Sequence, residues 1–158
     1  MREIRVIRGL SYGARSSAYQ FKNGGFFLVS TYTKNETFRE AIDVALDEVG
    51  KMRDIAVEAE ELESSKRYIS GLFPFRIETN DHLANWLTEI AFYGLDEGFV
   101  ENYRSEISEV TSEEAQEVAK KYFHVDDCMI VLLANYDEVK DQLAGLGEIE
   151  VIPFDEIE

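Results

Sequence analysis

Strand-like and helix-like patterns occupy separate blocks of this sequence instead of alternating along it. Residues 14–21 and 25–33 have the character of two strands, and Lys22-Asn23-Gly24-Gly25 between them is a hairpin turn signal. Five helical segments follow before the next strand-like run. Because parallel βαβ folds alternate strands and helices, this order argues against them. It predicts an α+β fold with helices packed on a largely antiparallel sheet.

The most regular helical pattern covers residues 37–54. Thr37 and Glu40 have the spacing of a capping box, and apolar residues from Phe38 to Met52 form a stripe at 3.6-residue spacing. A short helical signature also covers residues 1–8. The remaining predicted elements are helices over 58–72, from Asn80 or Asp81 to Tyr93, 96–107, 111–123 and 136–144, and strands over Cys128–Ala134 and 148–152.

The length and charge of the chain restrict its possible partners. Its 158 residues fit one domain, 1–158, and its net charge of −16 argues against nucleic acid, whose binding needs Lys and Arg to neutralise phosphates. Residues 1–35 hold six basic residues and one acidic residue, whereas residues 36–158 hold 31 acidic and ten basic residues. This acidic excess is either a solvated surface or a wall that attracts basic polypeptides.

The sequence contains no complete metal site. Zinc ligands usually come as His or Cys pairs at short spacing, whereas the two histidines, His82 and His124, are 42 residues apart and Cys128 is the single cysteine. Neither H-E-x-x-H nor H-x-x-E-H occurs. We therefore expect no metal in this chain, and we expect Cys128, within an apolar run, to be a core residue.

Gly9-Leu10-Ser11-Tyr12-Gly13 has the form G-x-S-x-G of the serine-hydrolase elbow. That elbow needs a strand before the serine and a helix after it, and here the predicted order is reversed. A glycine-flanked turn is the favoured interpretation, and a hydrolase with Ser11 as nucleophile is the weaker alternative.

No basic-then-apolar leader is visible, and the longest apolar run is far shorter than the roughly 20 residues that span a membrane. These features predict a soluble protein without membrane insertion. They favour the cytoplasm over the periplasm but leave the compartment open.

Three segments resemble the insulinase/pitrilysin family of zinc peptidases, which includes the mitochondrial processing peptidase. Met1–Gly13 is similar to the family segment L-R-x-x-R-G-L-x-Y, with Ile4 where leucine is usual. Gly25–Thr37 resembles a strand that runs into a Thr-rich helix entry. Phe73–Asn80, continued through Tyr93-Gly94-Leu95, is similar to F-P-x-R-x-E-T-N … Y-G-L. Together the resemblance covers most of the chain to about Asn135.

The resemblance implies a role for two residues. Family peptidases pair a zinc-bearing H-x-x-E-H half with a homologous half that lacks the zinc motif and lends an Arg and a Tyr, seven residues apart, to the active site. Arg5 and Tyr12 have that spacing and context. This chain is thus expected to be the non-catalytic C-terminal domain or subunit of a metallopeptidase, a half-domain of the processing-peptidase type that is N-terminally truncated, without its first strand-helix portion.

On this reading the chain binds extended polypeptide, is not catalytic alone, and needs a zinc-bearing homologous domain or subunit as partner. Zinc is expected in that partner half. Taken without the resemblance, Arg5 is a surface arginine and Tyr12 a packed strand-edge tyrosine. The alternative function is a structural or scaffolding homologue with no proteolytic role, and retention of Arg5 and Tyr12 favours the peptidase.

Overall fold

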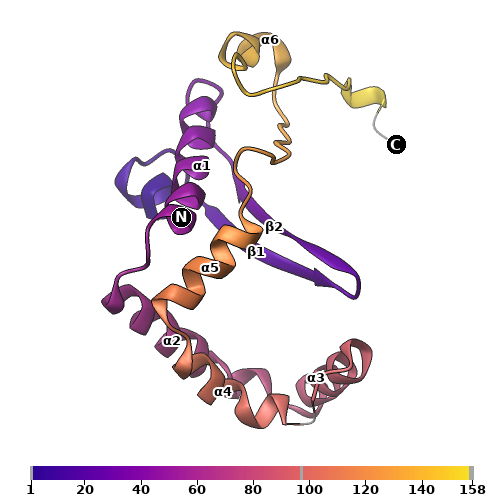
Figure 1. Ribbon diagram of the computed structural model, residues 1–158. Coiled ribbons are helices and arrows are strands. Elements are labelled where there is room, and N and C mark those ends of the chain that lie inside the picture. The colour runs from indigo at the N-terminus through magenta and orange to yellow at the C-terminus, as the bar shows by residue number, and fades with distance from the viewer. Residues whose placement is uncertain (1, 97, 157–158) are drawn as a thin grey trace. The chain divides into compact units, whose positions relative to one another are not determined.

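The computed structural model of the protein describes residues 2–96 and 98–156 (Figure 1). Contacts divide the chain into two compact units. The first holds the chain up to Ser16, Val29–Leu46 and the chain from Met129 onward; the second holds Ser17–Leu28 and Asp47–Cys128. The hairpin and the first long helix contribute residues to both units.

The secondary structure confirms the predicted α+β class: a run of helices follows a two-stranded sheet of consecutive strands. The elements are η1 (Glu3–Ile7), β1 (Ala14–Phe21), β2 (Gly24–Thr31), α1 (Phe38–Asp54), α2 (Ala59–Leu72), η2 (Pro74–Arg76), α3 (Asn80–Tyr93), α4 (Phe99–Glu109), α5 (Ser112–Tyr122), α6 (Tyr136–Val139), η3 (Lys140–Gln142) and η4 (Phe154–Glu156). The η1 segment is a π-helix, and the other three η segments are 3₁₀ helices.

The predicted hairpin is confirmed, and β1 and β2 run side by side as its two arms (Figure 1). Only Lys22 and Asn23 separate the strands, as in the tightest hairpins. Across the pair, the rings of Tyr19 and Phe26 stack with their centroids 4.7 Å apart. A Cβ atom at position 25 would collide with the Tyr19 carbonyl oxygen, which explains why Gly25 is a glycine.

In the first unit, α1 supplies the central part of the core. Phe38 is buried against Val139 of α6 and Leu143, and Ile42 and Leu146 complete the cluster. The first turn of α1 is therefore joined to residues about 100 positions later in the sequence. Phe38 confirms the start of the predicted stripe, but the other buried residues of α1 are Ala41 and Val44, and Met52 at the end of the stripe is 54% exposed.

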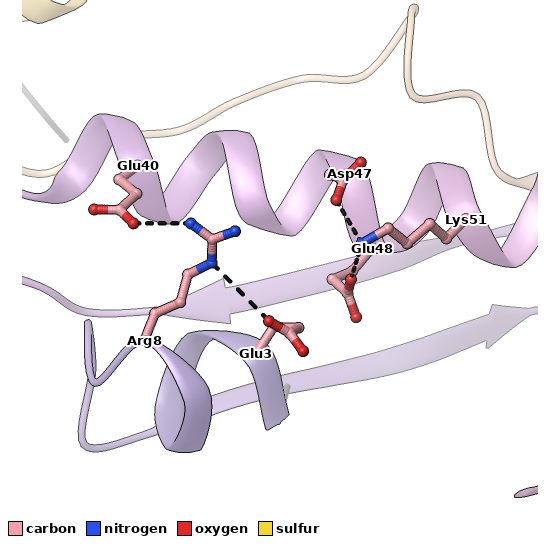
Figure 2. Close-up of polar contacts among 6 residues, drawn as sticks. All are labelled: Glu3, Arg8, Glu40, Asp47, Glu48 and Lys51. Carbon is pink, nitrogen blue, oxygen red and sulfur yellow. Dashed lines mark hydrogen bonds and ion pairs between the residues drawn. The ribbon is translucent and has the colours of Figure 1, made fainter.

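The last turns of α1 carry an ion-pair network that Figure 2 shows. The Lys51 ammonium group lies 2.7 Å from an Asp47 carboxylate oxygen and 2.8 Å from a Glu48 carboxylate oxygen. Hydrogen bonds to Asp47 first, then Glu48, raise the pKa of Lys51 above its usual value. Because Lys51 and Asp47 are exposed and Glu48 is only half-buried, these pairs at spacings of three and four residues support the helix only modestly.

In the second unit, four aromatic rings join α2, α3 and α4. Phe73, which follows α2, is buried and stacks on Tyr103 of α4 with ring centroids 4.5 Å apart. Trp86 of α3 lies edge-on to both rings at 5.9 Å, and Phe99 lies 5.7 Å from Trp86. This cluster gives the second unit its own core.

Helix α5 begins with the predicted capping box. The Thr111 hydroxyl accepts a hydrogen bond from the Glu114 N–H at 3.2 Å, while the Glu114 carboxylate accepts one from the Thr111 N–H at 2.8 Å. The hydrogen bond from the Thr111 N–H, and then that from its hydroxyl, lowers the pKa of Glu114 below its ordinary value of 4.5. A lowered pKa in the folded state means that the ionised carboxylate stabilises the fold.

Replacing Thr111 by alanine should therefore lower the free energy of unfolding by about 1 kcal/mol, because the helix loses its N-terminal cap. Glu114→Gln should reduce the free energy of unfolding near pH 7. It should also make that free energy decrease less steeply as the pH is lowered into the acid range. The Glu114 contribution is fully present above about pH 4.5 and is lost as the pH falls through the lowered pKa. Urea unfolding at several pH values measures both effects. Glu113→Gln, which removes a neighbouring charge outside the capping box, is the matched control. It should leave the pH dependence of the free energy of unfolding at low pH as it is in the parent protein.

Two helix starts differ from their predicted positions. Thr79, not Asn80 or Asp81, is the N-cap of α3, and its hydroxyl accepts from the His82 N–H at 3.2 Å. Helix α4 begins at Phe99, whereas Asp96 was expected to open it. The Asp96 carboxylate instead accepts a hydrogen bond from the Gly98 N–H at 2.7 Å, which favours a turn over a helix start.

The two later strands were predicted wrongly. Neither Cys128–Ala134 nor residues 148–152 pair with a strand of the described chain, whose sheet consists of β1 and β2. Cys128 is exposed, not in the core, and Met129 and Leu133 are 90% and 85% exposed. The physical reason is that a strand is held by hydrogen bonds to a neighbour, and an apolar composition does not supply that neighbour.

Within the described residues, none of the helices combines the length and the apolar character that crossing a bilayer requires.

Candidate functional site

Arg5 and Tyr12 lie together in the first unit. The Arg5 guanidinium carbon is 5.6 Å from the centroid of the Tyr12 ring, within the range of a cation–π contact. Both side chains are exposed, and 82% of Tyr12 is accessible to solvent. Neither side chain has a hydrogen-bond or ion-pair partner within residues 2–96 and 98–156, so their donor groups are available to a ligand.

The local fold explains how seven residues bring these side chains to one surface. Ile4 is 1% exposed and anchors η1, which leaves the adjacent Arg5 on the solvent side. Hydrogen bonds from the Arg8 N–H to the Glu3 carbonyl and from the Leu10 N–H to the Ile4 carbonyl, both 2.9 Å, close the helix. At Gly9 the backbone has φ = 62°, a left-handed conformation that glycine adopts without a steric penalty, and the chain turns back there.

Arg8 connects this turn to α1. Figure 2 shows its guanidinium between two carboxylates: it donates to Glu40 of α1 at 3.0 Å and lies 4.0 Å from Glu3. The predicted capping box at Thr37 and Glu40 is wrong, because the Thr37 N–H donates to the Lys34 carbonyl at 3.0 Å and not to the Glu40 carboxylate. The Glu40 carboxylate binds Arg8 instead, and the Thr37 hydroxyl contacts Thr33 and the Lys34 carbonyl.

Ser11 has a structural role in the same turn. Its hydroxyl donates to the Gly13 carbonyl at 2.7 Å and accepts from the Gly13 N–H at 3.1 Å, and the residue is 9% exposed. A π-helix precedes it and strand β1 follows, the reverse of the nucleophile elbow. The hydrolase interpretation of Ser11 is thus not supported, because the hydroxyl is committed to the backbone of its own turn.

Metal-ligating side chains do not converge anywhere in the described chain: its His, Cys, Asp and Glu residues form no group of three that could hold an ion. His82 has another use in α3. Its Nδ1 atom lies 3.0 Å from the Phe75 carbonyl, which can only accept, so this nitrogen carries the proton. The side chains of the described residues therefore do not fit a zinc site.

The second unit contains a cavity of about 1010 Å³ that was not predicted from the sequence. Aromatic side chains form much of its lining, and charged and amide groups complete it. A signal existed in the sequence, since the single tryptophan, Trp86, and the neighbouring aromatic residues contribute to both the core cluster and this lining. Their convergence depends on how α3 and α4 pack. The lining includes Phe75, Arg76, His82, Trp86, Glu89 and Tyr103.

Comparison with known proteins supports the resemblance seen in the sequence. Residues 1–69 match the family described as the peptidase M16 inactive domain. Among solved structures, the fold is similar to a crystal structure of a peptidase M16 inactive domain from Pseudomonas fluorescens, with a TM-score of 0.73 and 25% sequence identity over 80% of this chain. The match spans 30% of the length of that solved chain. A comparison with curated proteins gives no match.

Proposed function

We propose that this chain is the zinc-free half of an insulinase-type peptidase, because residues 1–69 match the peptidase M16 inactive domain and the fold is similar to that of a solved domain of this kind. In this role it holds an extended polypeptide beside the active site of a zinc-bearing homologous half. That half lies on the same polypeptide or on a separate subunit.

The observation that carries the proposal is the exposed Arg5–Tyr12 pair. The guanidinium presents several N–H donors and the phenol one O–H donor, and these groups lie on one surface. Donors placed together in this way can bind a main-chain carbonyl of a peptide. They can also stabilise the negative charge that develops on the carbonyl oxygen during hydrolysis.

A main-chain carbonyl is present in every peptide, so the Arg5–Tyr12 pair would recognise the backbone and not a particular side chain. The zinc of the partner half would supply the activated water for hydrolysis. Arg5 and Tyr12 would orient the scissile or a neighbouring carbonyl and hold its oxygen. The Arg8–Glu40 ion pair and the buried Ile4 hold the turn that carries both side chains.

Reconstitution of the peptidase from its two halves tests whether this chain is inactive alone and required by the zinc-bearing half. The purified chain alone should neither cleave peptides nor retain stoichiometric zinc after dialysis. Added to a zinc-bearing H-x-x-E-H half that is inactive by itself, it should restore chelator-sensitive peptidase activity. Chelator-sensitive cleavage by the purified chain alone would contradict the proposal.

The acidic charge of residues 36–158 suggests a substrate preference. We expect the assembled peptidase to cleave a basic peptide about tenfold faster than a neutral variant at low ionic strength, because a negative field raises the encounter rate with cations. The matched peptides should differ only by Lys→Gln changes away from the cleaved bond. The ratio should fall toward one at high salt, where the field is screened. Equal rates at low salt would show that the acidic residues form only a solvated surface.

A further inference from the structure

Threonine hydroxyls from β2 and the segment after it hold the turn between Arg5 and Tyr12. The Thr33 hydroxyl donates to the Leu10 carbonyl at 2.6 Å, and the Thr31 hydroxyl donates to the Gly13 carbonyl at 3.1 Å. Both hydrogen bonds are partly buried. They bind the two carbonyls that bracket Ser11 and Tyr12, so they fix the backbone from which the Tyr12 side chain projects.

The donors in this network can be assigned because a hydroxyl has only one proton. A carbonyl cannot donate, so Thr33 gives its proton to Leu10. In the 2.7 Å contact between the hydroxyls of Thr33 and Thr37, Thr37 must then be the donor, and its longer contact of 3.3 Å with the Lys34 carbonyl shares that same proton. The chain of hydrogen bonds runs from Thr37 to Thr33 to the Leu10 carbonyl. Leu10 also donates its N–H to the Ile4 carbonyl, so the same residue joins the threonines to η1 and hence to Arg5.

We propose that Thr33 is a positioning residue for the Arg5–Tyr12 pair: its hydrogen bond to the Leu10 carbonyl sets the relative placement of the guanidinium and the phenol. This inference rests on the proposed function. Thr33 does not touch the substrate and acts only through the turn. Its removal would leave a partly buried carbonyl without a partner and release the backbone between the two side chains.

Amide hydrogen exchange of the full chain tests the structural part of this inference without any partner. Thr33→Val removes the hydroxyl and keeps the shape of the side chain. It should speed exchange of the Leu10 amide, which bonds to Ile4, by about tenfold, the effect of losing one partly buried hydrogen bond. Thr33→Ser restores a donor and should return exchange toward the parent rate.

Thr37→Val is the matched control for this measurement. It removes a hydroxyl from the same network but keeps the hydrogen bond from Thr33 to Leu10, so the Leu10 amide should stay protected. Unchanged Leu10 exchange in Thr33→Val would overturn the inference. Equal loss of protection in Thr33→Val and Thr37→Val would also overturn it, because the effect would then belong to the whole segment.

Kinetics of the assembled peptidase test the functional part. Thr33→Val should lower kcat/KM about tenfold, and Thr33→Ser should keep it near the parent value. In a chain that already carries Arg5→Ala, adding Thr33→Val should lower kcat/KM little further, because the pair that Thr33 positions is already lost. Full additivity of the two substitutions would contradict a positioning role. If Arg5→Ala lowers activity but Thr33→Val does not, this inference alone fails. If neither Arg5→Ala nor Tyr12→Phe lowers activity, the proposed function fails and the positioning role fails with it.

Discussion

Replacing Arg5 by alanine should lower kcat/KM of the assembled peptidase by about 10²- to 10³-fold, the loss typical of removing one donor to a developing oxyanion. The exposed guanidinium has no other partner in the described part of the chain, so the change should leave the fold intact. Since the target is a main-chain carbonyl, the loss should be the same for peptides of different sequence. Peptide hydrolysis measured with several unrelated substrates checks this.

Tyr12→Phe is the sharper test of the same site, because it removes one hydroxyl and keeps the ring beneath the Arg5 guanidinium. If the phenol interacts most strongly with the transition state, kcat should fall. If it binds ground state and transition state equally, KM should rise while kcat is unchanged. Separate measurement of kcat and KM distinguishes these two uses of the hydroxyl.

Arg15→Ala is the control for loss of positive charge. Arg15 is an exposed arginine of β1 in the same basic segment, and its replacement should leave kcat/KM near the parent value. A double variant, Arg5→Ala with Tyr12→Phe, that keeps the parent activity in an intact, zinc-loaded complex would contradict the proposed site. It would favour a structural or scaffolding role for the chain.

Elements whose stability depends on local chemistry were predictable from the sequence. The β1–β2 hairpin follows from its turn residues, α1 from its stripe, and the α5 start from the capping box at Thr111, because each signal lies within a few neighbouring residues. The apolar segment after Cys128 has an equally clear composition but needs a strand partner to become a strand. Composition alone therefore predicted an element that the structure does not contain.

The candidate site divides in the same way. The seven-residue spacing of Arg5 and Tyr12 is visible in the sequence. Only the resemblance to the peptidase family implies that the two side chains act at an active site. The contacts that support the pair join residues far apart in the chain: Arg8 with Glu40, and Leu10 with Thr33. The capping box predicted at Thr37 fails for a local reason, since the Thr37 N–H donates to the Lys34 carbonyl at 3.0 Å and not to the Glu40 carboxylate.

The packing of the C-terminal part of the first unit against α1 depends on one aromatic side chain, Phe38. Phe38 is 7% exposed and packs on Val139 and Leu143, the two buried side chains that hold the segment after Asn135 to α1. Polar contacts reinforce this junction: Arg39 donates to the Gln142 carbonyl at 3.1 Å, and the Gln142 amide donates to the Asn35 carbonyl at 2.8 Å. These polar groups are set in place by the apolar cluster, because each of their partners lies within a few residues of it.

Phe38→Ala should therefore destabilise the first unit by about 3–5 kcal/mol, the range for removing a buried aromatic ring and leaving a cavity. Val139 and Leu143 would lose their shared neighbour, and the hydrogen bonds of Gln142 would become exposed to water. Hydrogen exchange should accelerate in Tyr136–Gln142 far more than in α3, which lies in the second unit. Tyr68→Ala, at a tyrosine of α2 that is 69% exposed, is the control and should change the stability by no more than about 0.5 kcal/mol. An equally small change for Phe38→Ala would mean that the contacts of α6 and Leu143 with α1 do not hold the C-terminal segment in solution.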